Sequence, residues 1–183
     1  VQLANALKGD SKFQGNWGEI VLERVLEESG LSKGREYETQ VALKNTEGQR
    51  RNPDVIVHLP DQRDIVIDAK VSLTDYERYC RASDMAEKQL FLKQHISSVR
   101  NHISGLSRKA YEQLEGINTL DFVLIFVPIE AAFMLAIEQD QQLFRDAYDK
   151  GIILVSPSTL LATLRTIHNI WRYEDQNRNA EKI

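Results

Sequence analysis

The residues best suited to chemistry are two aspartates and a lysine in segments rich in β-branched side chains. Asp54 opens the run DVIVHL at 54–59, and Asp68 and Lys70 lie near the end of the run DIVIDAKV at 64–71. Side chains alternate between the faces of a strand, so Asp68 and Lys70 share one face. Carboxylate oxygens suit Mg²⁺ or Mn²⁺, and a nearby ammonium group can stabilise developing phosphoryl charge or hold an attacking water. The three residues therefore predict a divalent metal site.

The turn between the two runs decides whether the acids meet. The turn residues at 60–62 predict an antiparallel hairpin in which Leu59 pairs with Arg63. Counting back along this register places Asp54 opposite Asp68, with their Cβ atoms about 4.5–5.5 Å apart. Two like charges at this distance destabilise the fold unless something neutralises them. We therefore expect a bound cation here, and we expect Asp68→Asn to relieve repulsion in the metal-free chain.

The opposite face of the hairpin is almost wholly apolar and is predicted to face the core. Its members are Val55, Val57, Leu59, Ile65, Ile67, Ala69 and Val71. The acidic face is then expected to line a cleft or to meet solvent. Asp-x-Lys and Pro-Asp also occur at 10–12 and at 60–61, outside strand positions. An exposed, charged sheet face without a function is the alternative interpretation at this stage.

The elements around the hairpin predict an α/β fold with a mixed sheet. A helix is predicted over 17–29, where apolar spacing ends at Gly30, and three antiparallel strands follow as a meander. Ser156 and Pro157 are typical of the N-cap and first position of a last helix, which extends at least to Tyr173. The other predicted elements are strands at 37–43, 54–59, 64–71, 122–127 and 152–155, and helices within 73–114, broken near 82–84, and at 129–139.

Length and composition narrow the class of protein. A chain of 183 residues suits one domain, and its 42% hydrophobic and 27% charged residues are ordinary for a globular protein. The net charge of −4 excludes a broadly basic nucleic-acid coat, and the single cysteine, Cys80, excludes an internal disulfide. No apolar run approaches the roughly 18 residues of a membrane span. Because residue 1 is valine, we expect the natural start to lie upstream.

Pro53-Asp54 followed by Asp68-x-Lys70 resembles the motif of the PD-(D/E)xK nuclease superfamily, and the chain more narrowly resembles the RmuC family of DNA recombination proteins. The stretches that carry this resemblance are GNWGE at 15–19, PDVIVHLP at 53–60, IDAKVSL at 67–73, FVPIE at 126–130, VSPSTLL at 155–161 and WRYE at 171–174. The resemblance implies a restriction-endonuclease-like core over 1–183, with an antiparallel meander in a mixed sheet flanked by helices. It also implies that residues 1–10 end an upstream coiled-coil helix.

The resemblance implies a metal-dependent DNA nuclease that acts in recombination and hydrolyses phosphodiester bonds with Mg²⁺-activated water, Mn²⁺ being a substitute. The residues carried over are Asp54, Asp68 and Glu19 as catalytic and metal-binding acids, Ala69 as a metal ligand through its carbonyl, and Lys70 as a catalytic residue. Glu23, one helical turn after Glu19, is the substitute for it. The alternative function is a non-catalytic module of the same fold that binds DNA ends or junctions, or docks a recombination partner.

DNA is the expected partner. The residues expected to contact it are Arg51, Arg63, Ser156, Arg165, His168 and Arg172. Three of these share one face of the last helix, and the N-terminus of that helix offers free N–H groups to a phosphate. For His58, His95 and His102 we expect packing or solvation rather than DNA contact. We also expect homo-oligomers through the upstream coiled coil, no membrane contact by this segment, and a location at the cytoplasmic face, where the resemblance implies an upstream anchor.

Overall fold

The computed structural model describes residues 11–44, 47–48, 50–106, 111–112 and 114–181. The predicted coiled-coil end at residues 1–10 lies outside these residues. The described residues form a five-stranded sheet with the strand order β1-β4-β5-β6-β7, which confirms an α/β fold with a mixed sheet. Its strands are β1 (Tyr37–Thr39), β4 (Val55–Leu59), β5 (Arg63–Asp68), β6 (Thr119–Phe126) and β7 (Ile152–Val155).

The strand directions divide the sheet into two parts. β1, β4 and β5 are antiparallel neighbours, whereas β5, β6 and β7 run parallel to one another. Parallel neighbours need crossover connections, and helices supply them here. These helices are α3 (Thr74–Arg81) and α4 (Met85–Gly105) before β6, and α6 (Glu130–Gln139) and α7 (Leu143–Asp149) before β7. The sequence patterns did not predict α7, which is one short segment of seven residues.

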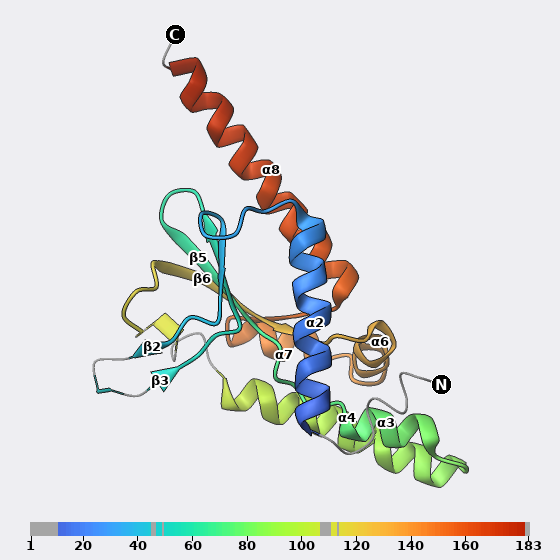
Figure 1. The fold of residues 1–183 in the computed structure, drawn as a ribbon. Helices are drawn as coiled ribbons and strands as arrows, with labels where there is room; N and C mark the ends of the chain where they lie inside the picture. The colour runs from blue at the N-terminus through green and yellow to red at the C-terminus, as the bar shows by residue number, and fades with distance from the viewer. Residues whose placement is uncertain (1–10, 45–46, 49, 107–110, 113, 182–183) are drawn as a thin grey trace.

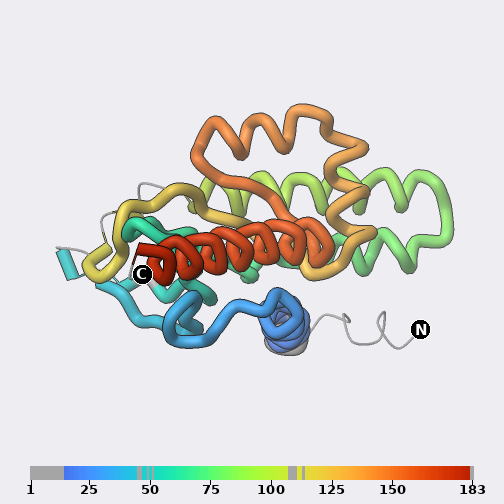
Figure 2. The backbone as a smooth tube through the Cα atoms, turned by 90° about the horizontal axis from the view of Figure 1, so that it is seen from above, coloured from blue at the N-terminus to red at the C-terminus, as the bar shows by residue number. Residues whose placement is uncertain are grey.

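Helices cover both faces of the sheet (Figure 1). α2 (Ser11–Ser29) and α8 (Pro157–Glu181) pack on one face, and α4, α6 and α7 contribute to the core on the other. Figure 2 shows α2 almost end-on at one side of the molecule and the helices between β5 and β7 at the other. None of the described helices combines the length and apolar character needed to cross a membrane.

The expectation that the acidic face of the hairpin meets a cleft or solvent is wrong for most of that face. Asp64 is fully buried and Asp68 is 3% exposed, and their neighbours Ile56 and Val66 are in the core with residues of α4. The physical reason is the parallel half of the sheet, because its crossover helices cover the face that a simple meander would leave open.

The predicted register of the hairpin is confirmed. Leu59 pairs with Arg63 and Val55 pairs with Ile67, so one further step brings Asp54 beside the end of β5. The turn contains two successive residues with positive φ, Asp61 at 69° and Gln62 at 58°. Aspartate tolerates this left-handed conformation better than most residues do. The local turn chemistry therefore sets which residues of β4 and β5 face each other.

The predicted strand at 37–43 is shorter than expected. β1 ends at Thr39 because Gln40 adopts a φ of 56°, which is outside the extended region, and its N–H bonds the carbonyl of Asp54 at 3.2 Å. The chain then forms a separate two-stranded sheet of β2 (Leu43–Lys44) and β3 (Arg50–Arg51) among the described residues. This small sheet leads directly into the segment that carries Asp54.

β4 also holds a histidine between two carboxylates. His58 Nδ1 lies 2.7 Å from Asp64 Oδ1, and His58 Nε2 lies 2.9 Å from Glu38 Oε2. The hydrogen bond to Asp64 is the largest cause that raises the pKa of His58 above its ordinary 6.5, and it outweighs the opposing effect of burial. Protonated His58 therefore stabilises the fold below about pH 6.5, and this stabilisation is lost as pH rises through the raised pKa.

We expect the free energy of unfolding, measured in urea, to differ between wild type and His58→Gln most at about pH 6 and least at about pH 9. The variant removes the titrating group while keeping a side-chain amide that can bond one of the two carboxylates. A difference of the same size at both pH values would contradict this assignment.

Candidate functional site

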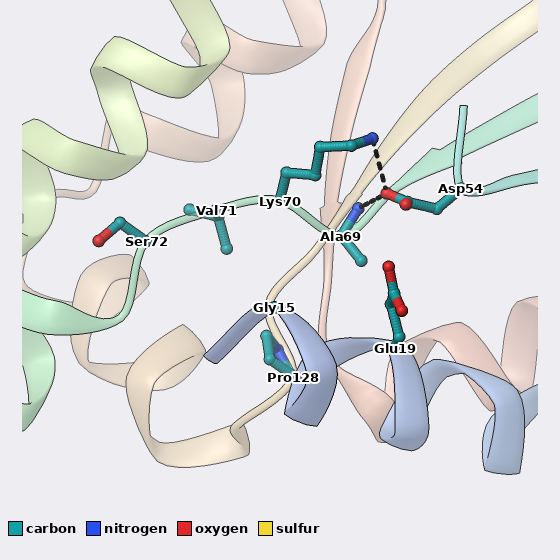
Figure 3. Close-up of a pocket in the computed structure, with 8 residues that line it drawn as sticks. All are labelled: Gly15, Glu19, Asp54, Ala69, Lys70, Val71, Ser72 and Pro128. Carbon is teal, nitrogen blue, oxygen red and sulfur yellow. Dashed lines mark hydrogen bonds and ion pairs between the residues drawn. The ribbon is translucent and has the colours of Figure 1, made fainter. Parts of the chain in front are cut away.

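A pocket of about 250 Å³ lies where the β4–β5 hairpin meets α2. Figure 3 shows its residues, which come from α2, from the residue before β4, from the residues after β5 and from the segment between β6 and α6. The lining residues are Gly15, Glu19, Asp54, Ala69, Lys70, Val71, Ser72 and Pro128. The pocket therefore gathers two carboxylates and an ammonium group at one end of the sheet.

Asp54 is the best-buried acid of this pocket, with 5% of its surface exposed. Its Oδ2 accepts a hydrogen bond from the backbone N–H of Ala69 at 2.8 Å and another from Lys70 Nζ at 3.1 Å. Lys70 Nζ also donates to the carbonyl of Asn52 at 3.0 Å, although the lysine side chain is 54% exposed. These bonds fix one oxygen of Asp54 to the far strand of the hairpin.

Lys70 joins the two aspartates that the hairpin register brings together. Its Nζ lies 3.1 Å from Asp54 Oδ2 and 3.7 Å from Asp68 Oδ2. The structure therefore assembles Asp54, Asp68 and Lys70 as one cluster. The ammonium group offsets the repulsion between the carboxylates, which differs from the expectation that they repel each other unless a metal is present.

Asp68 is held from the side of the sheet that α4 covers. Its Oδ1 lies 3.0 Å from His102 Nε2 and accepts the N–H of Lys70 at 3.0 Å, and its Oδ2 accepts the hydroxyl of Tyr111 at 3.3 Å. Burial raises the pKa of Asp68, but the hydrogen bond to His102 and the charge and N–H of Lys70 outweigh it and lower the pKa below the ordinary 3.8. Asp68 is thus an ionised carboxylate inside the protein.

Glu19 and the carbonyl of Ala69 complete the oxygen donors of the pocket. Glu19 is exposed on α2 and points toward Asp54 in Figure 3. Its neighbour Gly18 allows close approach of the helix, because a Cβ there would lie 3.4 Å from the carbonyl oxygen of Ala69. Glu23 lines an adjacent pocket of about 140 Å³ that shares Glu19 and Asp54 with the first.

The donors of the first pocket suit magnesium. Carboxylates and a backbone carbonyl are hard oxygen ligands, and Mg²⁺ usually takes one or two carboxylates together with waters and phosphate oxygens. Asp54, Glu19 and the Ala69 carbonyl match this requirement. A metal site built from protein side chains alone requires at least three such ligands close together. Within the part of the chain that the structure describes, no three His, Cys, Asp or Glu side chains form such a group. Ligation by Asp68 stays a prediction, because both of its oxygens already have protein partners.

The residues expected to bind DNA lie in several places. Arg63 is at the opposite end of β5 from the pocket, where its Nη2 lies 2.7 Å from Asp121 Oδ2. Arg51 is in β3, next to the Asn52 carbonyl that accepts from Lys70. On α8, Arg165 and Arg172 are exposed. Arg63, Arg165 and Arg172 do not line the pocket, and contact of the predicted residues with DNA stays a prediction.

Two predicted DNA contacts, one on α8 and one directly before it, have packing roles in the structure. His168 lies against Gly30 at the end of α2, where an added Cβ would be 3.3 Å from His168 Nε2. Ser156 is fully buried, and its Oγ lies 3.1 Å from Thr159 Oγ1. Both residues thus help to place α8.

The N-terminus of α8 already has an anionic partner. Glu130 Oε1 accepts the N–H of Ser158 at 2.6 Å. Burial raises the pKa of Glu130, but hydrogen bonds from Ser158 and Ser156 outweigh it and lower the pKa below 4.5. A phosphate at this helix end would have to displace the Glu130 carboxylate, which reduces the case for the predicted phosphate contact at Ser156.

Sequence reasoning assigned no site role to His102 or Tyr111. They lie 34 and 43 residues after Asp68, on segments whose apolar spacing indicates only a helix. The crossover between β5 and β6 returns the chain to the end of β5, and this return is what brings both side chains to Asp68. The contacts of His102 and Tyr111 with Asp68 therefore depend on the tertiary fold, and no local sequence pattern predicts them.

The sequence model of the RmuC family matches residues 1–183. The chain belongs to the RmuC family. A DNA recombination protein RmuC homolog of Pseudomonas aeruginosa is 59% identical over 181 residues, which are 99% of this chain and 40% of that protein. DNA recombination protein RmuC of Escherichia coli K12 is 56% identical over 183 residues, which are 100% of this chain and 38% of that protein. This RmuC-family chain therefore spans well under half the length of these curated relatives.

The contacts of Asp68 predict the effect of removing its charge. In Asp68→Asn, an amide group would face donors from His102, Tyr111 and Lys70. We expect a loss of about 1–3 kcal/mol in the free energy of unfolding without metal. This expectation reverses the one drawn from the sequence, in which the same change relieves repulsion.

Asp121→Asn is the matched control for this loss. Asp121 in β6 pairs with the exposed Arg63 at the start of β5, so its replacement should cost less than about 1 kcal/mol. Urea unfolding of both variants at neutral pH in EDTA gives the comparison. Equal losses, or a more stable Asp68→Asn, would show that the network around Asp68 does not stabilise the fold.

Proposed function

We propose that this chain is the catalytic domain of an RmuC-family protein that acts in DNA recombination, with a PD-(D/E)xK-type core that hydrolyses DNA in a metal-dependent reaction. The single observation that carries the proposal is the Lys70 ammonium, which lies 3.1 Å and 3.7 Å from the carboxylates of Asp54 and Asp68 beside an open pocket. The printed names of the relatives, DNA recombination protein RmuC, support the process.

The acids would hold the metal. Asp54, Glu19 and the Ala69 carbonyl face the pocket and would be its ligands. Asp68 would join them by exchanging the Tyr111 hydroxyl at its Oδ2, while His102 stays bonded to Oδ1. When bound, Mg²⁺ or Mn²⁺ supplies a Lewis acid that offsets charge on the scissile phosphate. The ion would also let a polyanionic substrate approach acids that otherwise repel it. This fits a chain with a net charge of −4.

Lys70 would act on the reacting phosphate. Its Nζ bonds Asp54 and Asn52, and its side chain is 54% exposed and lines the pocket. In the reaction a water oxygen bonds to phosphorus, the bond from phosphorus to the leaving sugar oxygen breaks, and that oxygen takes up a proton. An ammonium group at this place would orient the water or stabilise charge on a non-bridging oxygen.

A non-catalytic role in binding DNA ends, DNA junctions or a recombination partner is the second candidate. The observation that favours it is the saturation of Asp68, whose two oxygens have protein donors without any metal. A carboxylate with these hydrogen bonds can have a purely structural role, without taking part in a reaction. Cleavage assays separate the two candidates.

We expect the wild-type chain to cut linear, nicked or branched DNA with Mg²⁺ or Mn²⁺ and not with EDTA. Lys70→Met should lower the single-turnover rate at least about 100-fold, with DNA affinity nearly unchanged, because Lys70 acts on the transition state. Lys93→Met, at an exposed position of α4, is the control and should cut at the wild-type rate. Wild-type cleavage by Lys70→Met would remove the lysine from the mechanism, and binding of DNA without cleavage by wild type would favour the second candidate.

We also expect the melting temperature of Lys70→Met to respond to added metal. Without Lys70, the two buried carboxylates lose their shared counter-charge, so Lys70→Met should melt at a lower temperature than wild type in EDTA. Added Mn²⁺ replaces that charge and should raise the melting temperature of Lys70→Met more than that of wild type. Equal Mn²⁺ shifts in Lys70→Met, Lys93→Met and wild type would show that no metal binds at these carboxylates.

A further inference from the structure

α4 reaches the acidic cluster from the covered side of the sheet. His102 is in the last turn of this helix, and its side chain is 22% exposed. Its Nε2 lies 3.0 Å from Asp68 Oδ1. An ionised carboxylate can only accept hydrogen bonds, so the Nε2–H of His102 donates a hydrogen bond to this oxygen.

The helix that carries His102 is firmly anchored. Val99 and Ile103, on either side of His102 along α4, are buried in the core. Arg100 Nε lies 2.6 Å from Asp140 Oδ2, and its Nη1 lies 2.9 Å from Asp146 Oδ2. These contacts hold α4 against α6 and α7. The backbone position of His102, from which the imidazole extends toward Asp68, is therefore fixed.

The bonds on Asp68 set the orientation of its carboxylate. Oδ1 takes the His102 imidazole and the N–H of Lys70, while Oδ2 takes the Tyr111 hydroxyl and lies 3.7 Å from Lys70 Nζ. His102 therefore acts on the oxygen that does not contact the Lys70 ammonium. Loss of this bond would free the carboxylate to rotate, and the spacing between Asp68 and Lys70 would change with it.

We propose that His102 is a positioning residue for the reaction, which it controls through the carboxylate of Asp68. This inference rests on the proposed function, since it assigns His102 to the same acidic cluster. Partners of metal-binding carboxylates fix the orientation of the ligand, and their removal typically costs 10–100-fold in metal affinity or activity. His102 touches neither the pocket nor the substrate, and its effect is on geometry.

The test measures Mn²⁺ affinity by calorimetry and single-turnover cleavage in the 183-residue chain. We expect His102→Ala to lose about 10–100-fold in Mn²⁺ affinity or in cleavage rate, with KM for DNA unchanged. His102→Gln keeps an N–H donor on a side chain of similar reach and should recover most of the loss. Asn101→Ala, at the exposed neighbouring position, should match wild type in both measurements. His102→Leu, which removes the donor and keeps volume, replaces His102→Ala if that variant does not fold.

The outcomes distinguish this inference from the proposed function. Wild-type Mn²⁺ affinity and cleavage rate in folded His102→Ala or His102→Leu would overturn the inference, whatever the melting temperature, because a purely structural residue changes stability alone. If wild type binds Mn²⁺ without cutting DNA, the nuclease proposal fails, and the Mn²⁺ affinities of the variants still decide the role of His102. A wild-type chain that binds no Mn²⁺ overturns both.

Discussion

Two buried carboxylates share one half-exposed ammonium group at the end of the β4–β5 hairpin. Asp54 and Asp68 are 5% and 3% exposed, and burial of unpaired carboxylates is costly. The Lys70 ammonium offsets this cost from a position two residues after Asp68, beyond the end of β5. Removal of Lys70 would leave both carboxylates without their shared counter-charge, so this ammonium group constrains the end of the hairpin. The register of β4 on β5 brings the two aspartates to the same end of the hairpin, where Asp54 and Lys70 line the pocket.

The two sides of the cluster have different surroundings, and this difference assigns their roles. On the α2 side, Gly18 lets the helix approach the Ala69 carbonyl, and Glu19 faces an open pocket. On the α4 side, His102 and Tyr111 occupy the oxygens of Asp68. Asp54 is thus the acid that faces incoming ligands, and Asp68 is the acid that the protein holds in place. In the proposed reaction, chemistry at Asp54 on the α2 side would depend on packing around Asp68 on the α4 side.

The sequence predicted the hairpin well because its signals are local. Turn residues at 60–62 and strict alternation in both strands determine the register, and β7 and the start of α8 at Pro157 follow from equally local patterns. The burial of the acidic face was not predictable in this way. It depends on the crossover helices between the parallel strands, and the alternation of side chains within β4 and β5 contains no information about those helices. The roles of His102 and Tyr111 depend on the same long-range return of the chain. Short elements such as α7 and the β2–β3 sheet also carry too few residues for a clear period.

In the proposed function, a bound metal ion would take over the positive charge that the Lys70 ammonium supplies to Asp54. A crystal of this chain soaked in Mn²⁺ and measured at the manganese absorption edge tests it most directly. The account predicts an anomalous peak within ligand distance of the Asp54 carboxylate and the Ala69 carbonyl, with Lys70 Nζ moved away from Asp54. A chain with no such peak, and with Lys70 still bonded to both carboxylates at high Mn²⁺ concentration, would contradict it.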